Sequence, residues 1–402
     1  MSLLAIDGGP RVRQTPLAPW PVFAADEIDA AIRVLASGRV NYWTGDECAA
    51  FEREFAAAIG VRYAIALANG TVALELALKA LGIGPGDEVI VPSRTFIATA
   101  SCAVAVGATP VVADVDPHSG NLTAQTLSAA ISERSRAVIP VHMAGWPCDM
   151  APIIELAARH RLHVVEDCAQ SHGAAYHGRP TGSLGACAAF SFCQDKIITT
   201  AGEGGMLVTD DPALWRRAWE YKDHGKSWEA VHNRQHPPGF RWLHESFGTN
   251  WRMSEVQAAI GRRQLAKLPV WSARRRRNAE LLAAGLQGLP GLRIPQPAAG
   301  IQHAYYKLYA FVEPAQLGMD WTHQRILAAI NAEGIPCMAG SCCEIYRERA
   351  FVAAGLGPAR PLPLAQALSQ TSLMFVVHPT LDDQDMADTA AAVRKVMQAA
   401  AK

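Results

Sequence analysis

The sequence has none of the features that mark a membrane-bound or nucleic-acid-binding protein. Its 402 residues include 37 lysines and arginines and 37 aspartates and glutamates, so the formal net charge is zero. That balance gives no electrostatic attraction to nucleic acid or to an anionic membrane. We find no run of about 18 uncharged apolar residues and no basic segment followed by a long apolar core near the start, so we expect neither a membrane span nor a signal peptide.

Closely spaced cysteine pairs are missing as well. The nine cysteines are scattered along the chain, and no two of them form a C-x-x-C motif. A structural zinc site needs paired ligands of that kind, so we expect no metal centre. Buried, reduced thiols in a cytoplasmic protein are the expected state of these residues.

What the sequence does contain is a regular alternation of strand and helix patterns. Short apolar runs at 63–68, 88–91, 110–115, 137–141 and 162–165 are separated by helical patterns. Runs of this kind are typical of strands that are buried on both faces. Their alternation with helices predicts an α/β fold with a mostly parallel sheet flanked by helices.

A second, smaller unit is predicted toward the C-terminus. A long helical pattern at 253–289 is followed by alternating strand and helix patterns up to a last helix at 384–399. We place the domain boundary within the long helix. The prediction is a large domain over 1–265, which includes a proline-rich N-terminal arm, and a small C-terminal α/β domain over 266–402.

Two motifs of the large domain lie where α/β folds bind ligands. Asn69-Gly70-Thr71 stands between a strand and a helix, and the free amides and the dipole of such a helix start attract phosphate. Asp167 ends a predicted strand, where side chains point into the ligand crevice of a parallel sheet. A carboxylate there can keep a heteroaromatic nitrogen protonated. Taken alone, the first motif is better explained as an ordinary helix start, and Asp167 alone is a weak signal because an aspartate that caps the next turn is common.

Lys196 is the third candidate. It lies in a polar loop between apolar runs at 188–192 and 206–208, with Ser191 near the end of the first run. Desolvation and neighbouring cations can lower the pKa of a lysine in such a place, and its amine can then form a Schiff base with an aldehyde. The glycine-rich turn at 202–205 is followed by a strand rather than a helix, which argues against a Rossmann site and a nicotinamide-dependent oxidoreductase.

Together the three motifs supply what pyridoxal 5'-phosphate needs from a protein. A helix start anchors the phosphate, a carboxylate pairs with the ring nitrogen, and a lysine holds the aldehyde as an imine. The carboxylate keeps the ring nitrogen protonated, which makes the ring an electron sink. The sequence therefore predicts an enzyme that uses pyridoxal 5'-phosphate.

At these residues the sequence resembles a known family, the sugar aminotransferases of the DegT/DnrJ/StrS type. The matching motifs keep the family's order: Thr71 in NGTVALELAL, Phe96 in PSRTFIATA, Asp167 and Gln170 in EDCAQSHGA, Ser191 and Lys196 in FSFCQDKIITTAGEGG, and Asn250 in GTNWRMSEVQAAIG. The resemblance runs from about residue 22 to the C-terminus. It implies the fold type I PLP-transferase architecture, in which a large domain with a mostly parallel seven-stranded sheet is followed by a smaller C-terminal α/β domain.

The resemblance also implies a role for each matched residue. Lys196 would form the Schiff base (internal aldimine) with the cofactor and then move the proton as general acid and base, and Asp167 would pair with the pyridine nitrogen. The remaining residues would bind the cofactor: Gly70, Thr71 and Ser191 at the phosphate, Phe96 stacked on the ring, Gln170 near the phenolic oxygen, and Asn250 reaching the phosphate from the other subunit of a homodimer.

The implied activity is that of a PLP-dependent transaminase. The amino group of L-glutamate or L-glutamine would pass in a ping-pong reaction to a keto-sugar, mostly nucleotide-linked, in amino-sugar biosynthesis for polysaccharides or secondary metabolites. Many members that act on nucleotide sugars have a histidine two residues after the phosphate-contacting serine, where this chain has Cys193 and then Gln194. Members that act on cyclitols often have glutamine near this position, so a keto-cyclitol or related carbocycle is the alternative acceptor.

Two other outcomes within the family are disfavoured by the same residues. A non-enzymatic regulator on this fold is a distant alternative, and its expected signature, loss of Lys196 or Asp167, is absent. Family members that are dehydratases have histidine at the lysine position, so Lys196 favours transamination. The segment at 223–250 is longer than in the plainest members, and we hypothesise that it shapes the acceptor pocket from the dimer partner. Unchanged acceptor kinetics after its replacement by a short linker would refute this.

Overall fold

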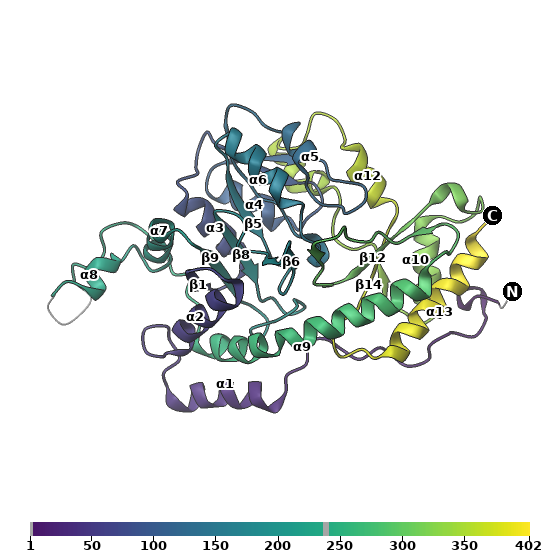
Figure 1. Cartoon of the computed structure of the whole chain (residues 1–402), viewed down its shortest axis with the longest axis horizontal. Coiled ribbons are helices and arrows are strands. Elements are labelled where there is room, and N and C mark those ends of the chain that lie inside the picture. The colour runs from purple at the N-terminus through teal and green to yellow at the C-terminus, as the bar shows by residue number, and fades with distance from the viewer. Residues whose placement is uncertain (1–2, 236–240) are drawn as a thin grey trace.

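A seven-stranded sheet forms the core of the larger part of the protein (Figure 1). The computed structural model describes residues 3–235 and 241–402. The strand order is β1-β9-β8-β5-β4-β2-β3. Strand β9 runs antiparallel to both of its neighbours, whereas the pairs from β8 to β3 are parallel. The predicted α/β fold with a mostly parallel sheet is confirmed. The strands are Tyr63–Leu67 (β1), Glu88–Pro92 (β2), Thr109–Ala113 (β3), Ser135–Val138 (β4), His163–Asp167 (β5), Cys187–Ser191 (β8) and Gly205–Thr209 (β9).

Helices cover both faces of this sheet because alternate residues of each strand face opposite sides. Ile65 and Leu67 of β1 pack with helices α3 (Gly70–Ala80), α4 (Ala98–Ala105) and α7 (Pro212–Lys222). Ala64 and Ala66 pack on the opposite side with α2 (Glu47–Ile59) and α9 (Glu255–Leu286). Helices α5 (Ala124–Ser128) and α6 (Met150–Arg159) cover the rest of that side. The apolar runs of the sequence are therefore buried on both faces.

A smaller antiparallel sheet lies toward the C-terminus. Its order is β10-β12-β14-β13, and it shares a core with helices α10 (His323–Ala332) and α13 (Asp383–Ala400). Its strands are Leu292–Arg293 (β10), Leu308–Val312 (β12), Cys337–Met338 (β13) and Ser372–Phe375 (β14). A third, short sheet of order β11-β6-β7 joins Ile301–Gln302 (β11) to Ala175–Tyr176 (β6) and Arg179–Pro180 (β7).

Helix α9 extends along both large and small sheets (Figure 1). It has 32 residues, and at 1.5 Å per residue it is about 48 Å long. Its first part packs against α1 (Ala25–Ser37) and α2, and its last part packs against α13. Pro269 lies inside the helix and lacks the N–H that would bond to the carbonyl four residues earlier.

The N-terminal arm crosses to the smaller sheet. Leu4 is buried in the core of that sheet, and Val12 packs against the same core. Arg13 forms an ion pair of 2.8 Å with Asp385 and another of 2.8 Å with Asp388, both at the start of α13. The first residues, which the sequence groups with the large domain, are thus held by the C-terminal unit.

One helix is shorter than its sequence pattern. Helix α5 ends at Ser128, whereas the pattern extends to residue 133. Beyond it, Ser132 and Arg134 turn toward Glu88 at the start of β2, and the Arg134 Nε donates to this carboxylate at 2.9 Å. Strand β4 then begins at Ser135. A side-chain contact between elements so far apart in the chain leaves no trace in helical periodicity.

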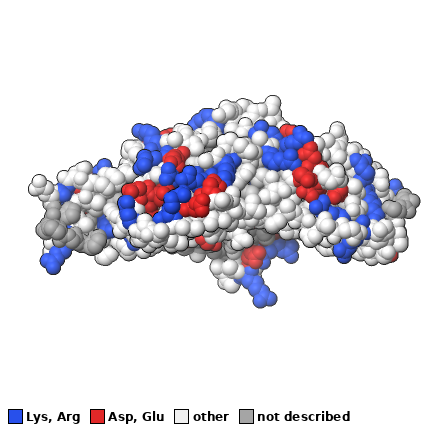
Figure 2. Space-filling view, turned by 90° about the horizontal axis from the view of Figure 1, so that it is seen from below, with Lys and Arg blue, Asp and Glu red and all other residues white. Residues whose placement is uncertain are grey.

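The face that carries α1 and α9 is charged without being of one sign. Figure 2 shows lysine and arginine side chains interleaved with aspartate and glutamate side chains on this face. Ion pairs made by α9 contribute to the pattern, since Arg262 lies 2.6 Å from Glu54 and Arg277 pairs with Asp383. Within the described residues, no helix combines the length and the apolar character needed to cross a membrane.

Candidate active site

The predicted site residues meet at one edge of the large sheet. Asp167 is the last residue of β5 and Ser191 is the last residue of β8, and these strands are parallel neighbours in which Asp167 pairs with Ala189. Gly70 begins α3 shortly after β1, and Phe96 follows β2. Since the carboxyl ends of parallel strands lie at the same edge of a sheet, residues far apart in sequence converge there.

Asp167 is buried, and both of its carboxylate oxygens accept hydrogen bonds. The Thr99 hydroxyl donates to Oδ2 at 2.8 Å, and the Ala169 amide donates to Oδ1 at 3.1 Å. The Thr95 hydroxyl lies 2.7 Å from that of Thr99, so the two threonines form a chain that ends at the carboxylate. Burial raises the pKa of Asp167, while the hydrogen bonds and the charge of Lys196 oppose this shift. A buried carboxylate of this kind is suited to pair with a cation.

The start of α3 forms a corner against the end of β8. Asn69 caps the helix by accepting a hydrogen bond of 3.0 Å from the Val72 amide. The amides of Gly70 and Thr71 have no acceptor among the described residues. A Cβ atom at Gly70 would lie 2.7 Å from the Cβ of Ser191, so only glycine allows this close approach. Two free amides, a hydroxyl and the positive end of a helix therefore lie together where a phosphate would bind.

Lys196 lies half-buried in the loop between β8 and β9. Its amide donates to the Cys193 carbonyl at 3.1 Å, and its carbonyl accepts from the Trp20 indole at 2.9 Å. The Lys196 Nζ is 5.2 Å from the centre of the Tyr306 ring, and the Tyr306 hydroxyl donates to Asp195. Residues of the N-terminal arm and of the smaller unit thus hold the lysine loop in place.

Two buried side chains beside Lys196 have unsatisfied nitrogens. Within the described residues, neither ring nitrogen of His172 has a hydrogen-bond partner, and Arg275 lacks partners for Nε and Nη2. Burial, together with the charges of Lys196 and Arg275, lowers the pKa of His172 to about 3, so the imidazole is neutral. Burial also lowers the pKa of Arg275 to about 9, which leaves the guanidinium charged at neutral pH. Arg275 therefore brings a positive charge to the surroundings of Lys196, where the carboxylates of Asp195 and Asp167 also lie.

Gln170 anchors the loop that follows β4. Its Oε1 accepts a hydrogen bond of 2.8 Å from the Ala144 amide, and Ala144 has a φ of 58°, which is uncommon for a residue with a Cβ atom. The Gln170 Nε2 has no acceptor among the described residues. This amide nitrogen can therefore donate a hydrogen bond to a ligand.

Phe96 and Asn250 are predicted site residues whose side chains are exposed to solvent in the single chain. Phe96 is 68% exposed. Asn250 is also exposed and forms an isolated bridge with Asp223. The chain therefore brings together the corner at Gly70, Asp167 and Lys196, but it covers neither Phe96 nor Asn250.

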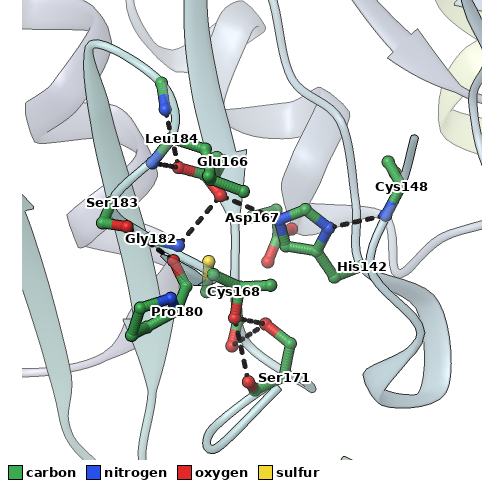
Figure 3. A network of polar contacts seen from close by, with 12 residues as sticks. His142, Cys148, Glu166, Asp167, Cys168, Ser171, Pro180, Gly182, Ser183 and Leu184 are labelled. Carbon is green, nitrogen blue, oxygen red and sulfur yellow. Dashed lines mark hydrogen bonds and ion pairs between the residues drawn. The ribbon is translucent and has the colours of Figure 1, made fainter. Parts of the chain in front are cut away.

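Glu166 holds the strand end from the side opposite to Asp167 (Figure 3). Its carboxylate accepts from the amides of Gly182, Leu184 and Gly185, each at 2.8 Å, and lies 3.0 Å from the Nε2 of His142. Burial opposes the charge, but His142 and the amides outweigh it and lower the pKa of Glu166. The network fixes the turn at 182–185 and the end of β5 to each other.

Part of this network has the composition of a metal site. His142, Glu166 and Cys168 offer ligand atoms within 4.8 Å of one another. Both nitrogens of His142 are already used, since Nδ1 accepts a hydrogen bond of 3.0 Å from the Cys148 amide. The group therefore supports the strand end through hydrogen bonds, and the expected absence of a metal centre stays a prediction.

A sizeable cavity lies elsewhere in the fold. Its volume is about 740 Å³, and it is lined by residues of β3, α5 and α12 (Pro363–Ser369). None of the predicted site residues lines it. The candidate site is therefore identified by its side-chain chemistry and not by the size of a cavity.

The residues at the sheet edge fit pyridoxal 5'-phosphate. The corner at Gly70 suits the phosphate, the buried carboxylate of Asp167 suits a protonated ring nitrogen, and Lys196 supplies a primary amine. Sequence reasoning did not identify Thr99, Trp20 or Tyr306 as parts of this site. Thr99 stands in the same motif as Phe96, but Trp20 lies 176 positions from Lys196 and carries no local signal.

Known proteins of similar sequence and structure are aminotransferases. The family model described as DegT/DnrJ/EryC1/StrS aminotransferase family matches residues 21–394. The dTDP-3-amino-3,4,6-trideoxy-alpha-D-glucose transaminase of Streptomyces venezuelae is 40% identical over 359 residues, which cover 89% of this chain and 88% of that protein. The L-glutamine:2-deoxy-scyllo-inosose aminotransferase of Streptoalloteichus tenebrarius is 36% identical over 420 residues, which cover 98% of this chain and 97% of that protein. The X-ray structure of an aminotransferase from Psychrobacter cryohalolentis has a TM-score of 0.93 and 51% identity, covering 96% of this chain and 99% of that chain.

Proposed function

The chain belongs to the DegT/DnrJ/EryC1/StrS aminotransferase family, and from this premise we propose that it transfers an amino group to a nucleotide-linked keto-sugar. The donor is L-glutamate or L-glutamine, and the reaction is a ping-pong transamination with pyridoxal 5'-phosphate. The observation that carries the proposal is the meeting of Lys196, Asp167 and the corner at Gly70 at one sheet edge.

Pyridoxal 5'-phosphate, when bound, supplies an aldehyde that carries the amino group and a ring that takes up the electrons of the broken bond. The buried carboxylate of Asp167 would keep the ring nitrogen protonated, and the Thr99 hydroxyl keeps that carboxylate oriented. The remaining cofactor contacts are proposed for Gly70, Thr71 and Ser191 at the phosphate, Gln170 at the phenolic oxygen, Phe96 on the ring face, and Asn250 from a second subunit.

Lys196 is the proposed general acid and base. Its backbone is anchored through Cys193 and Trp20, while its side chain is only half-buried and can move. The Nζ would take a proton from the donor carbon that bears the amino group and deliver it across the nitrogen to the former aldehyde carbon of the cofactor, a 1,3-proton shift.

A keto-cyclitol is the second candidate acceptor. A relative that matches almost the whole chain is named for 2-deoxy-scyllo-inosose. The loop beside Lys196 has Cys193 followed by Gln194, and Gln194 is exposed, where it can contact a substrate. Both acceptors present a ketone to the same amine, so the chemistry at Lys196 is the same for each.

The enzyme is proposed to work as a homodimer. Ile28, Ile32 and Leu35 form an exposed apolar row on α1, with 50%, 55% and 61% of their surfaces open. The segment around α8 (Trp228–His232) projects from the body of the protein (Figure 1), and Phe247 within the same loop is fully exposed. Such apolar surfaces mark protein interfaces. A second copy of the chain would cover them and bring Asn250 to the neighbouring site.

We place the reaction in amino-sugar biosynthesis in the cytoplasm. All nine cysteines are free thiols, which supports a reducing compartment. Secretion of the protein with formation of disulfides in its native host would contradict this location.

The proposed activity is tested with purified protein, added cofactor and a panel of acceptors. L-Glutamate or L-glutamine should abolish the visible band of the bound cofactor, and the correct ketone should restore it and yield an amino product detected by mass spectrometry. The panel contains keto-sugars linked to dTDP, UDP or GDP, and 2-deoxy-scyllo-inosose. Product from the cyclitol alone would favour the second candidate. A wild-type protein that responds to no amino donor would refute transamination, and a Lys196→Ala variant as active as wild type would refute the role of Lys196.

A further inference from the structure

A second lysine lies beside Lys196 and has no role in the reaction described above. The side chain of Lys307, just before β12, is 12% exposed. Its Nζ is 4.8 Å from the centre of the Tyr306 ring, and the Lys196 Nζ is 5.2 Å from the same centre, so the two nitrogens are at most about 10 Å apart. A lysine of the smaller unit thus stands next to the lysine of the large sheet.

The ammonium group of Lys307 has unused hydrogen-bonding capacity. Its ion pair with the Oδ2 of Asp195 measures 3.9 Å, which is longer than a hydrogen bond, and that oxygen already accepts from the Tyr306 hydroxyl. Within the described residues, the contacts of the Nζ are this ion pair and the face of the Tyr306 ring, and neither is a hydrogen bond. An ammonium group offers three donors, and the described residues accept a hydrogen bond from none of those of Lys307. Lys307 can therefore bind an anion that the chain itself does not supply.

The charges around Lys307 also leave room for an anion. The ionisable groups that act on it are Asp195, Arg275 and Lys196, so one carboxylate faces three cations when Lys307 is counted. The side chain of Asp195 is 54% exposed, which weakens its effect through solvent screening. Burial lowers the pKa of Lys307, and the two neighbouring cations add to this shift while Asp195 opposes it. A bound carboxylate would offset the excess of positive charge.

We propose that Lys307 binds the α-carboxylate of the amino donor while the donor amine is held at Lys196, an assignment that rests on the proposed transamination. The amine and the carboxylate of an amino acid are attached to one carbon and lie about 3 Å apart. A donor whose amine lies near the Lys196 Nζ can thus place its carboxylate between the two lysines. The flexible stem of Lys307 covers the remaining distance. Lys307 thereby selects donors that carry an α-carboxylate.

Binding of the donor is measured without any acceptor, from the concentration of L-glutamate that gives half of the maximal rate of loss of the visible band of the bound cofactor. Lys307→Met removes the charge and largely keeps the length of the side chain, and it should weaken the binding of L-glutamate by about 10- to 100-fold. Lys307→Arg should stay within about threefold of wild type, because it keeps a cation at this place. Lys79→Met removes one positive charge from α3, remote from the site, and should leave donor binding unchanged.

A donor analogue separates the carboxylate from the rest of the amino acid. 4-Aminobutyrate is L-glutamate without its α-carboxylate, and wild type should bind it about 10- to 100-fold more weakly than L-glutamate. In Lys307→Met the two compounds should bind alike, because the group that Lys307 recognises has already lost its partner. Equal binding of both compounds by wild type would overturn the proposal without any variant.

The outcomes also separate this proposal from the other possible roles of Lys307. Weaker binding of the acceptor with unchanged donor binding would show that Lys307 contacts an anionic group of the acceptor, which overturns the assignment. Equal loss of donor, acceptor and cofactor affinity in Lys307→Met would show a structural role and would overturn it too. A wild-type protein whose cofactor band no amino donor changes would refute the proposed transamination itself, a different result from both.

Discussion

Replacing Thr99 by valine tests whether the two threonines keep Asp167 charged. Valine has the shape of threonine without the hydroxyl, so the bond of 2.8 Å to Oδ2 is lost while the Ala169 amide still donates to Oδ1. Thr95 loses its partner in the same step. Because Thr99 is 1% exposed, water has little access to the vacated position.

The size of the effect follows from the charge on the acceptor. A hydrogen bond to a charged group contributes about 1.5–3 kcal/mol, which corresponds to roughly 10- to 150-fold in an equilibrium constant. Burial already raises the pKa of Asp167, and loss of the Thr99 hydroxyl raises it further. The carboxylate then holds a proton on the ring nitrogen of the cofactor less firmly.

The assay follows the visible band of the bound cofactor after a pulse of L-glutamate. The rate constant of its loss should fall about 10- to 150-fold in Thr99→Val, and the pH dependence of the band should shift. Thr99→Ser should restore both. Thr389→Val is the matched control, since Thr389 is 2% exposed on α13 and its hydroxyl donates to the Asp385 carbonyl at 2.7 Å. If Thr99→Val and Thr389→Val gave the same rates and spectra, the threonines would have no such role.

Three further experiments address the corner at Gly70, the hydrogen bonds of Glu166 and the buried His303. Gly70→Ala, whose Cβ would lie 2.7 Å from that of Ser191, should weaken cofactor binding about 10-fold or more in equilibrium dialysis. Gly84→Ala, whose nearest atom is 3.7 Å away, should not, and equal affinities would contradict the corner. Glu166→Gln replaces an accepting oxygen by an NH2 group that faces the donors of Gly182 and His142. It should therefore lower the free energy of unfolding in urea by roughly 2–6 kcal/mol. Glu54→Gln at a surface pair should cost about 0–1 kcal/mol, and a similar cost for both would refute the network. Burial lowers the pKa of His303 from 6.5 to about 3, so the unfolded chain takes up this proton first. The contribution of neutral His303 to the free energy of unfolding is fully present above pH 6.5. It is lost as the pH falls from 6.5 to about 3, at about 1.4 kcal/mol per pH unit. His303→Gln should reduce the slope of unfolding free energy against pH by one proton, and an unchanged slope would count against a neutral His303.

The sequence indicates the groups that carry the chemistry because each stands in a local motif at a strand end. Gly70 follows β1, Asp167 ends β5, and Lys196 follows β8, and a parallel sheet brings such positions to one edge. Thr99 lies in an equally visible motif, yet the direction of its hydroxyl depends on how α4 packs. That packing is not written in the motif itself.

Residues that hold the site in place were harder to predict for a physical reason. Trp20 and Tyr306 reach Lys196 from elements that approach it only after folding, and no periodicity encodes such contacts. The shortened α5 has the same cause, since Glu88 binds Ser132 and Arg134 from another element. The role of Asn250 stays a prediction because it involves a second subunit.

Helix α9 connects the two parts of the protein, and Pro269 lies inside it. The N-terminal part of the helix packs against α1 and α2, and the C-terminal part packs against α13 and shares the core of the smaller sheet. Because Pro269 has no N–H to donate to the Leu265 carbonyl, the helix bends most easily here, next to the domain boundary proposed between residues 265 and 266. Tyr306 and Lys307 lie beyond this bend, and the hydrogen bond from the Tyr306 hydroxyl to Asp195 connects that part of the chain to the loop of Lys196.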